Sequence, residues 1–223
     1  MIHPVIKLIE EGEHQQLDFK FEIADAHKIA RTLVAFANTD GGRLLIGVKD
    51  DGTISGIHTD EEYYMVETAA RLYCKPTVDL SVKEWNLSKK TVLEVIVLKS
   101  LNRPHFAKNH DGKWIPYLRV KDQNFVVNRI LLNVWKKESL PKGVFLKFTD
   151  AERFLLQYLE TEPSITVSKF ARSTGISRNK AEQILVRFLL IKIIQMHFTE
   201  NQTFFTLTSK KDETWDRKFV YPS

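Results

Sequence analysis

The sequence predicts an α+β fold, and three segments near the N-terminus carry that prediction. Residues 17–21 alternate, with the odd-numbered side chains apolar, as in a half-buried strand. Residues 26–37 place apolar side chains three and four apart over about four turns, which indicates a helix ending near Asn38. Residues 44–48 form a nearly continuous apolar run, typical of a strand buried on both faces. Helices and strands therefore mix around one sheet.

The rest of the chain divides into a first domain, a linker and a smaller second domain. We expect the remaining elements of the first domain to be a helix over 61–73, strands near 78–84, 92–98 and 114–121, and a closing helix over 126–137. Turn-forming residues at 139–143 then break the apolar periodicity. The predicted divisions are a first domain over 1–140, a linker over 141–148, a second domain over 149–209 and a polar tail over 210–223.

The second domain has clear helix boundaries. Thr149 and Glu152 form a capping box that opens one helix, Gly175 stops a second over 167–174, and Ser177 caps a third over 178–189. Two strand-like segments, 193–198 and 203–207, then suggest a hairpin. This order of elements resembles the winged helix-turn-helix family. The resemblance implies that the third helix meets nucleic acid.

Composition sets the broad class of protein. The chain has 223 residues, 43% of them apolar, and a net charge of +5, which permits binding to a polyanion. A single cysteine, Cys74, excludes an internal disulfide and a cysteine-based zinc site, and it suggests a reducing compartment. No signal-peptide core opens the chain, and apolar runs such as 188–191 are too short to span a bilayer. We therefore expect a cytoplasmic protein with no membrane partner.

Several ordered blocks near the N-terminus carry a second resemblance. They are Gly12-Glu13, Asp18-Phe19-Lys20, Ala35-Phe36-Ala37-Asn38-Thr39-Asp40-Gly41-Gly42 and Ile46-Gly47-Val48-Lys49-Asp50-Asp51-Gly52, with Gly56 closing the run. The pattern resembles the Alba-like DNA-binding domain of Schlafen proteins and of many bacterial regulators, over roughly the first 130 residues. The resemblance implies a nucleic-acid partner, DNA rather than RNA, and a role in transcription regulation that needs no cofactor. It also implies a homodimer, because Schlafen nuclease cores use two related lobes and this chain has one.

Acidic residues within these blocks raise an alternative function. In Schlafen-type domains with nuclease activity, two acids lie five positions apart, Phe-Lys follows the second, and a third acid follows the Gly-Val strand. The resemblance implies that Glu13, Asp18 and Asp50 hold Mg²⁺ or Mn²⁺ and that Lys20 stabilises charge on the scissile phosphate. The other interpretation is a solvated strand face and an ordinary turn. We favour it because relatives usually carry Glu at the position of Asp18, and it predicts that Asp18→Asn is nearly silent in stability.

The second domain supplies the main candidates for nucleic-acid contact. Its cations between residues 169 and 192 are Lys169, Arg172, Arg178, Lys180, Arg187 and Lys192, against one acid, Glu182. Arg178, Asn179 and Lys180 occupy the first turn of the third helix, where such helices contact phosphates and base edges. The competing interpretation is a solvated helix face on an adaptor that only dimerises through this domain. The local charge of +5 favours nucleic acid.

Two further groups in the first domain have open interpretations. Gly41 and Gly42 form a turn after the predicted helix, either to let a phosphate approach or to stop the helix. Tyr117 and Arg119 alternate on one face of a predicted strand, where an aromatic ring and a cation can stack a base and hold a phosphate. The alternative places Tyr117 in the core with Arg119 at its rim, and it is slightly favoured.

Overall fold

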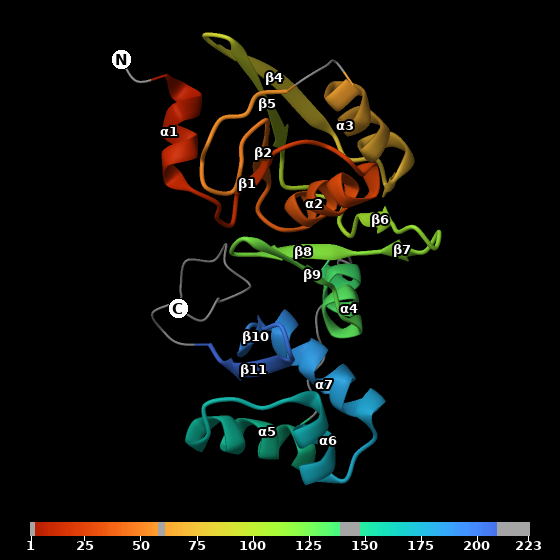
Figure 1. Ribbon diagram of the computed structural model, residues 1–223. Helices are drawn as coiled ribbons and strands as arrows, with labels where there is room; N and C mark the ends of the chain where they lie inside the picture. The colour runs from red at the N-terminus through yellow and green to blue at the C-terminus, as the bar shows by residue number, and fades with distance from the viewer. Residues whose placement is uncertain (1–2, 58–60, 139–147, 209–223) are drawn as a thin grey trace. The chain divides into compact units, whose positions relative to one another are not determined.

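The computed structural model describes residues 3–57, 61–138 and 148–208, and the chain forms two compact units (Figure 1). The units comprise residues 1–127 and 128–223. The elements of the first unit are α1 (Pro4–Glu11), β1 (Leu17–Lys20), α2 (Ala26–Asn38), β2 (Gly42–Ile46), α3 (Glu61–Leu72), β3 (Cys74–Lys75), β4 (Leu80–Leu87), β5 (Lys90–Val97), β6 (Phe106–Lys108), β7 (Trp114–Ile115), β8 (Tyr117–Val120) and β9 (Gln123–Val126). Those of the second are α4 (Arg129–Glu138), α5 (Asp150–Thr161), α6 (Val167–Thr174), α7 (Arg178–Leu190), β10 (Ile194–Phe198) and β11 (Thr203–Leu207).

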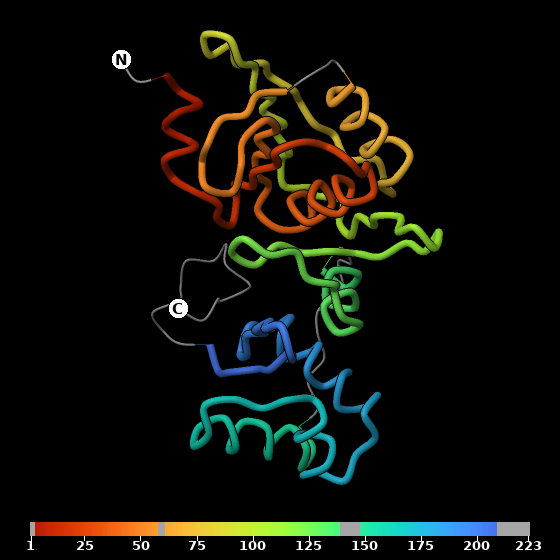
Figure 2. Tube along the Cα trace, in the orientation of Figure 1, coloured from red at the N-terminus to blue at the C-terminus, as the bar shows by residue number. Residues whose placement is uncertain are grey.

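A four-stranded sheet of order β1-β2-β5-β4 organises the first unit. Strand β1 runs parallel to β2, and α2 makes the crossover between them, a path that is easily followed in the tube trace (Figure 2). Strand β5 runs antiparallel to both β2 and β4. Asp18 pairs in register with Leu44, so the acidic block of β1 lies beside the buried strand β2. The expected mixed fold is therefore present.

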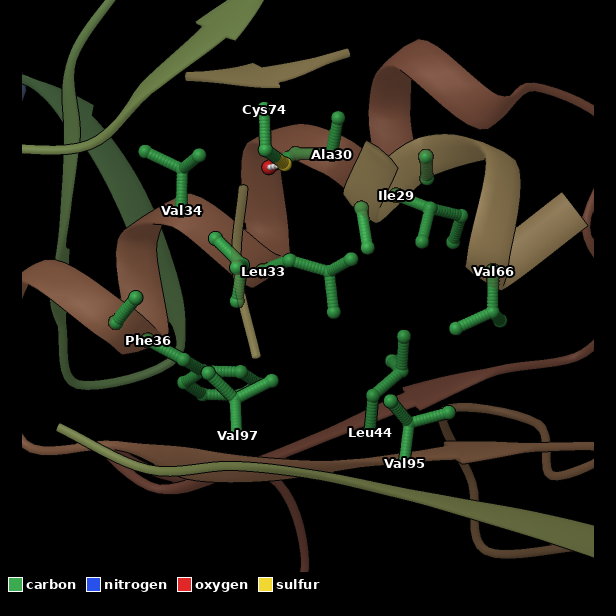
Figure 3. Close-up of a cluster of buried hydrophobic side chains, with 14 of the residues drawn as sticks. Ile29, Ala30, Leu33, Val34, Phe36, Leu44, Val66, Cys74, Val95 and Val97 are labelled. Atoms are coloured by element: carbon green, nitrogen blue, oxygen red, sulfur yellow. Dashed lines mark hydrogen bonds between the residues drawn. The ribbon is translucent and has the colours of Figure 1, made fainter. Parts of the chain in front are cut away.

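Both faces of this sheet are covered. Leu44 and Ile46 face a core that includes the apolar sides of α2 and α3, whereas Leu45 faces a smaller core with Val5 of α1 and Phe19 of β1. The close-up of the larger core shows side chains of α2 directed onto the strands below (Figure 3). Near-continuous burial along β2 confirms the prediction made from its apolar run.

Helix α2 begins and ends where its sequence predicts. The Asp25 carboxylate accepts a hydrogen bond from the backbone N–H of His27 and so caps the helix, which continues to Asn38. Within the core, the Cys74 thiol lies 3.8 Å from the carbonyl oxygen of Ala30 (Figure 3). Burial raises the pKa of this thiol to about 12, so Cys74 stays protonated and acts as a small apolar side chain.

Close packing explains the two glycines that follow α2. Gly41 has a φ of +72°, and a Cβ there would lie 2.8 Å from the carbonyl oxygen of Val97. A Cβ on Gly42 would lie 2.3 Å from the ring of Phe36. The side-chain amide of Asn38 donates to the carbonyl oxygens of His105 and Tyr117 across the same turn. The turn therefore has a packing role, in agreement with the helix-stop interpretation.

Two expected elements take a different form. The single strand expected over 114–121 is interrupted at Pro116, so that β7 joins a sheet of order β3-β6-β7 while β8 pairs with β9. Proline lacks the N–H that a continuous ladder needs at that position. Val126, expected as the first residue of the closing helix, is instead the last residue of β9 in this hairpin. The helix itself, α4, begins at Arg129.

The second unit contains four helices and a hairpin among its described residues. Helices α5, α6 and α7 precede the hairpin of β10 and β11, and Ile165 pairs with Phe205 beside it. The capping box of Thr149 and Glu152 opens α5 as predicted. Helix α4 packs on α7, and its contacts place it in this unit rather than in the first domain, to which the sequence assigned it. Except for Phe148, the predicted linker lies outside the described residues, and the whole of the predicted tail lies outside them too.

Among the residues that the structure describes, no helix is both long enough and apolar enough to cross a membrane.

Candidate functional site

The predicted acidic cluster forms in part, and a distant arginine occupies its centre. Asp18 is only 4% exposed in β1, and Arg119 of β8 is 1% exposed beside it. Asp18 Oδ1 lies 3.0 Å from Arg119 Nη2, and Asp18 Oδ2 lies 3.0 Å from Lys20 Nζ. Each carboxylate oxygen of Asp18 is therefore held by a cation from within the unit.

Arg119 also joins three chain segments through its guanidinium. It donates to the backbone carbonyl oxygens of His14 and Leu17 at 3.1–3.3 Å and to the side-chain oxygen of Asn124 at 3.3 Å. Its guanidinium carbon also lies 5.0 Å from the ring centre of Phe36. A planar donor fork is suited to several fixed acceptors at once. Arg119 thus holds the segment before β1 against α2 and the β8–β9 hairpin.

This arrangement corrects two expectations about exposed surfaces. Asp18 does not lie on a solvated strand face, because Arg119 covers the side of β1 that faces away from α1. Phe21, expected on the apolar face of that strand, is 41% exposed because β1 ends at Lys20. Arg119 is buried, so it lies neither on an open face with Tyr117 nor at the rim of the core, the two interpretations that the sequence left open. The Tyr117 ring is half-buried and lies 5.8 Å from the guanidinium carbon of Arg31.

Glu13 joins the cluster from the segment that precedes β1. Its carboxylate accepts a 2.8 Å hydrogen bond from the backbone N–H of Phe19 and neighbours the carboxylate of Asp18. The pKa of Glu13 is raised: burial raises it most, and Asp18 raises it further, while the Phe19 N–H and Lys20 act in the opposite direction. Glu13 therefore takes up a proton more readily than an exposed glutamate does.

The third predicted acid is placed differently. Asp50 is exposed in the turn that follows Val48. Across the described ranges of the chain, no three His, Cys, Asp or Glu side chains are grouped so that they could share a metal ion. A divalent ion at Glu13 and Asp18 would also have to displace Arg119 and Lys20 from the carboxylate. Glu13, Asp18 and Asp50 therefore do not fit a divalent-metal site as they are arranged, and the catalytic role proposed for them stays a prediction.

A cationic face lies on α6 and α7 of the second unit. Lys169 and Arg172 are exposed on successive turns of α6, and Asn179 and Lys180 are exposed in the first turn of α7. Between these helices, Gly175 takes the left-handed conformation with a φ of +66°. The Ser177 side chain accepts from the N–H of Lys180 and so fixes the start of α7. The residues predicted for nucleic-acid contact are thus largely brought together.

Arg178 has an internal partner on this face. Its Nε lies 3.1 Å from Glu182 Oε1, and one terminal nitrogen donates to Ser168 on α6 at 3.3 Å. Arg129 of α4 approaches the other oxygen of Glu182 at 3.9 Å and donates to the side chain of Asn179 at 3.1 Å. Glu182 is mostly buried, whereas both arginine side chains are more than two-thirds exposed. Glu182 therefore orients two cations while their outer surfaces stay open to solvent.

Arg187 does not belong to the exposed face. Its Nη2 donates to Glu152 Oε1 at 2.5 Å, and the Glu152 side chain is only 1% exposed. The same carboxylate accepts from the backbone N–H of Thr149 in the capping box of α5. Arg187 thus joins α7 to the start of α5, a pairing that corrects its expected role in nucleic-acid contact. Glu152 was identified from the sequence as a capping residue, but nothing local to it indicates this second bond.

Two solved structures show some similarity to the chain. One is the DIP2311 protein from Corynebacterium diphtheriae, with 18% identity, a TM-score of 0.41, and coverage of 79% of this chain and 32% of that one. The chain therefore spans about a third of the length of that protein. The other is the N-terminal domain of a RecG-related protein from Nitrosomonas europaea, with 21% identity, a TM-score of 0.37, and coverage of 57% and 97%.

A family model gives a more direct assignment. The model described as Schlafen, AlbA_2 matches residues 13–128, which are more than half of the chain. The matched range begins at Glu13 and includes β1, the turn after α2 and the β8–β9 hairpin that carries Arg119. The chain belongs to the Schlafen AlbA_2 family.

Proposed function

We propose that this protein binds nucleic acid, DNA in preference to RNA, and regulates transcription through a winged helix-turn-helix in its second unit. The exposed cationic face of α6 and α7 carries the proposal. On that face Lys169, Arg172 and Lys180 have no carboxylate within ion-pair distance among the described residues. Cations gathered on one face without counter-charges attract a polyanion.

The local geometry supports contact through the start of α7. The first backbone N–H groups of a helix point away from its body and carry a partial positive charge, which favours phosphate. Arg178 and Lys180 add two full charges at the same end, and the side-chain amide of Asn179 adds hydrogen-bonding groups. Such an end suits a helix that approaches the major groove by its N-terminus.

Family membership supports the same class of partner at a coarse level only. The family name includes AlbA, and one similar structure comes from a RecG-related protein. That likeness has a TM-score below 0.5, so it adds nothing to the argument about this chain. The preference for DNA, the role in transcription and the homodimer remain parts of the proposal. Binding itself would require no cofactor.

Two alternatives remain with different strengths. A metal-dependent endonuclease using Glu13, Asp18 and Asp50 gains some support from the contact between Glu13 and Asp18. The ion pairs from Arg119 and Lys20 to Asp18 count against it. An adaptor that uses the second unit only to dimerise does not account for Lys169, Arg172 and Lys180, which have no carboxylate within ion-pair distance in the part of the chain that the structure describes.

Salt-dependent binding tests the proposal. We expect Arg178→Ala and Lys180→Ala each to weaken binding to a duplex and to reduce the slope of log affinity against log salt by about one per lost phosphate contact. Fluorescence anisotropy with a labelled duplex, measured at several salt concentrations, gives both quantities. Lys180→Ala is the cleaner variant, because Lys180 has no ion-pair partner to leave behind among the described residues.

A matched control is Lys137→Ala, which removes an exposed lysine from the last turn of α4. We expect this variant to change neither affinity nor slope appreciably. Equal effects from Lys137→Ala and Lys180→Ala would show that only net charge matters. If both Arg178→Ala and Lys180→Ala kept the wild-type affinity and salt slope, the face of α6 and α7 would not be the surface that binds the duplex.

A further inference from the structure

A small pocket opens in the first unit, away from the acidic cluster. Its volume is about 170 Å³, and it lies where the first two turns of α2 meet the end of β6, two elements that are in contact (Figure 1). The side chains that line it and matter for its chemistry are His27, Lys28, Arg31, Lys108, His110 and Tyr117. None of them was assigned a role from the sequence except Tyr117.

Positive charge converges on this pocket. Lys28 and Arg31 lie one turn apart on α2, and Lys108 ends β6. Among the described residues, none of these three cations has a carboxylate within ion-pair distance. Of the acids near this pocket, Asp25 is paired with His110 at 3.1 Å, and Asp111 accepts a 3.4 Å hydrogen bond from the lining residue Asn109. Like charges held together repel each other unless an anion lies between them.

The two histidines are held in fixed orientations by hydrogen bonds. The Nδ1 of His27 lies 2.8 Å from the carbonyl oxygen of Lys108, which can only accept, so Nδ1 carries the proton. The Nε2 of His110 likewise donates to the carboxylate of Asp25. The His27 ring packs against those of Tyr73 and His110, with its centroid 4.0 and 4.4 Å from theirs. Nε2 of His27 is then the acceptor nitrogen, so it is not among the groups that bind phosphate oxygens in this pocket.

Aromatic rings hold two of the cations. The Arg31 guanidinium lies 5.8 Å from the centre of the Tyr117 ring, and the Lys108 ammonium lies 5.9 Å from that of Trp114. Such contacts restrain long side chains that would otherwise sample many rotamers. Trp114 is 39% exposed, and so it offers a flat surface next to Lys108 on which a base could stack.

Size and charge together define the ligand. Pockets that enclose a whole small molecule usually measure about 300–1,000 Å³, so this one accommodates a single charged group with the remainder outside. A phosphate monoester carries close to two negative charges and three acceptor oxygens near neutral pH. That charge matches three cations better than the single charge of an internal phosphodiester.

We propose that this pocket binds the terminal phosphate of a nucleotide or of a nucleic-acid strand. Lys28, Arg31 and Lys108 bind the phosphate oxygens, and the attached nucleoside lies against the exposed ring of Trp114. The proposal goes beyond the function proposed above, because the pocket lies in the other unit and uses no residue of α6 or α7.

Isothermal titration of the full-length protein with adenosine 5′-monophosphate and with adenosine tests the phosphate. We expect the monophosphate to bind at least about tenfold more tightly, because charge-assisted hydrogen bonds are lost with the phosphate. Equal affinity for the two, or binding of neither adenosine 5′-monophosphate nor a 5′-phosphorylated strand, would overturn the proposal.

Substitutions then locate the site. Arg31→Gln and Lys108→Gln should each weaken binding of the preferred phosphate ligand by about tenfold. Lys113→Gln is the matched control, since Lys113 is exposed in the turn that follows β6 but does not line the pocket. Loss of binding in the control equal to that in both pocket variants would show general charge attraction and contradict the assignment.

Oligonucleotides distinguish the two sources of phosphate. A single strand with a 5′-phosphate should bind more tightly than the same strand with a 5′-hydroxyl if the ligand is a strand end. Tighter binding of the free nucleotide than of the phosphorylated strand instead assigns the pocket to a nucleotide, and either result supports a site for a phosphate monoester. If the phosphate improves binding neither in the strands nor in the nucleotide, the proposed monoester site is contradicted. Failure here leaves the function proposed for α6 and α7 intact, because that function is measured with 5′-hydroxyl duplexes and with Arg178→Ala and Lys180→Ala.

Discussion

Asp18 lies in a sheet next to α2, and both of its carboxylate oxygens contact cations. Such a carboxylate loses much of its hydration on folding, and Arg119 and the hydrogen bonds around it replace that hydration. The guanidinium of Arg119 is also fully used within the unit, because its other N–H groups donate to the backbone carbonyl oxygens of His14 and Leu17, at and before the start of β1. The pair therefore acts as part of the frame of the first unit, and the effect of mutating it should be seen first in stability.

We expect Asp18→Asn and Arg119→Met each to lower the free energy of unfolding by about 3–5 kcal/mol. Asp18→Asn leaves the buried guanidinium of Arg119 without its carboxylate, and Arg119→Met leaves the buried carboxylate of Asp18 with only the ammonium of Lys20. Asp50→Asn is the matched control, since Asp50 is exposed, and its effect should stay within about 0.5 kcal/mol. Urea unfolding followed by circular dichroism measures all three.

The double variant of Asp18 and Arg119 should lose less stability than the sum of the single variants, because the charges are removed together. A nearly silent Asp18→Asn, as expected for a solvated strand face, would contradict the ion pair. Strict additivity would show that the two residues act separately.

Sequence spacing identified some of these contacts and could not identify others. Glu13 and Asp18 are close in the chain, and their proximity was expected from the family pattern. Arg119 lies 101 residues from Asp18, and no local pattern indicates which strand will cover β1. The cations around the small pocket were not predicted from the sequence for the same reason, since Arg31 and Lys108 line one pocket only because α2 packs on β6.

At the scale of elements, local signals were reliable where the element is stabilised by its own residues. Helices α2, α6 and α7 begin at side-chain caps from Asp25, Thr166 and Ser177. The strand expected over 114–121 was misjudged because Pro116 separates two pairings. The closing helix was expected to begin at Val126, and the pairing of that residue with Tyr117 of β8 makes it part of a strand.

Helices α6 and α7 carry arginines of two kinds, and their variants should separate binding from stability. Arg187→Ala leaves the buried carboxylate of Glu152 without its cation, so we expect a loss of about 3–5 kcal/mol in the free energy of unfolding. Arg172→Ala on α6 is the control, because that side chain is exposed, and it should weaken duplex binding with little change in stability. Urea unfolding and fluorescence anisotropy measure the two properties.

A second substitution checks the cause of the Arg187 effect. Replacing Glu152 by Gln in Arg187→Ala should recover part of the lost stability, because the unpaired charge is then gone. An Arg187→Ala variant that keeps full stability and loses duplex binding would instead return Arg187 to the binding face.

For the whole molecule, the candidate sites belong to different units. The acidic cluster and the phosphate pocket are built within residues 1–127, and the cationic face is built within residues 128–208. Each unit encloses its own apolar side chains, including Leu33 in the first and Leu185 in the second, both 0% exposed. A compact unit with its own core can unfold independently of the other.

Calorimetry of the full-length chain should therefore show two unfolding transitions, and a cavity in one core should lower only one of them. We expect Leu33→Ala and Leu185→Ala each to cost about 2–5 kcal/mol in their own unit. For units of this size, such a loss lowers the midpoint of one transition by on the order of 10 °C or more. The two variants serve as controls for each other, because each should leave the transition moved by the other in place. If both variants shift one common transition by similar amounts, the units unfold together, and ligand binding in one would then stabilise the other as well.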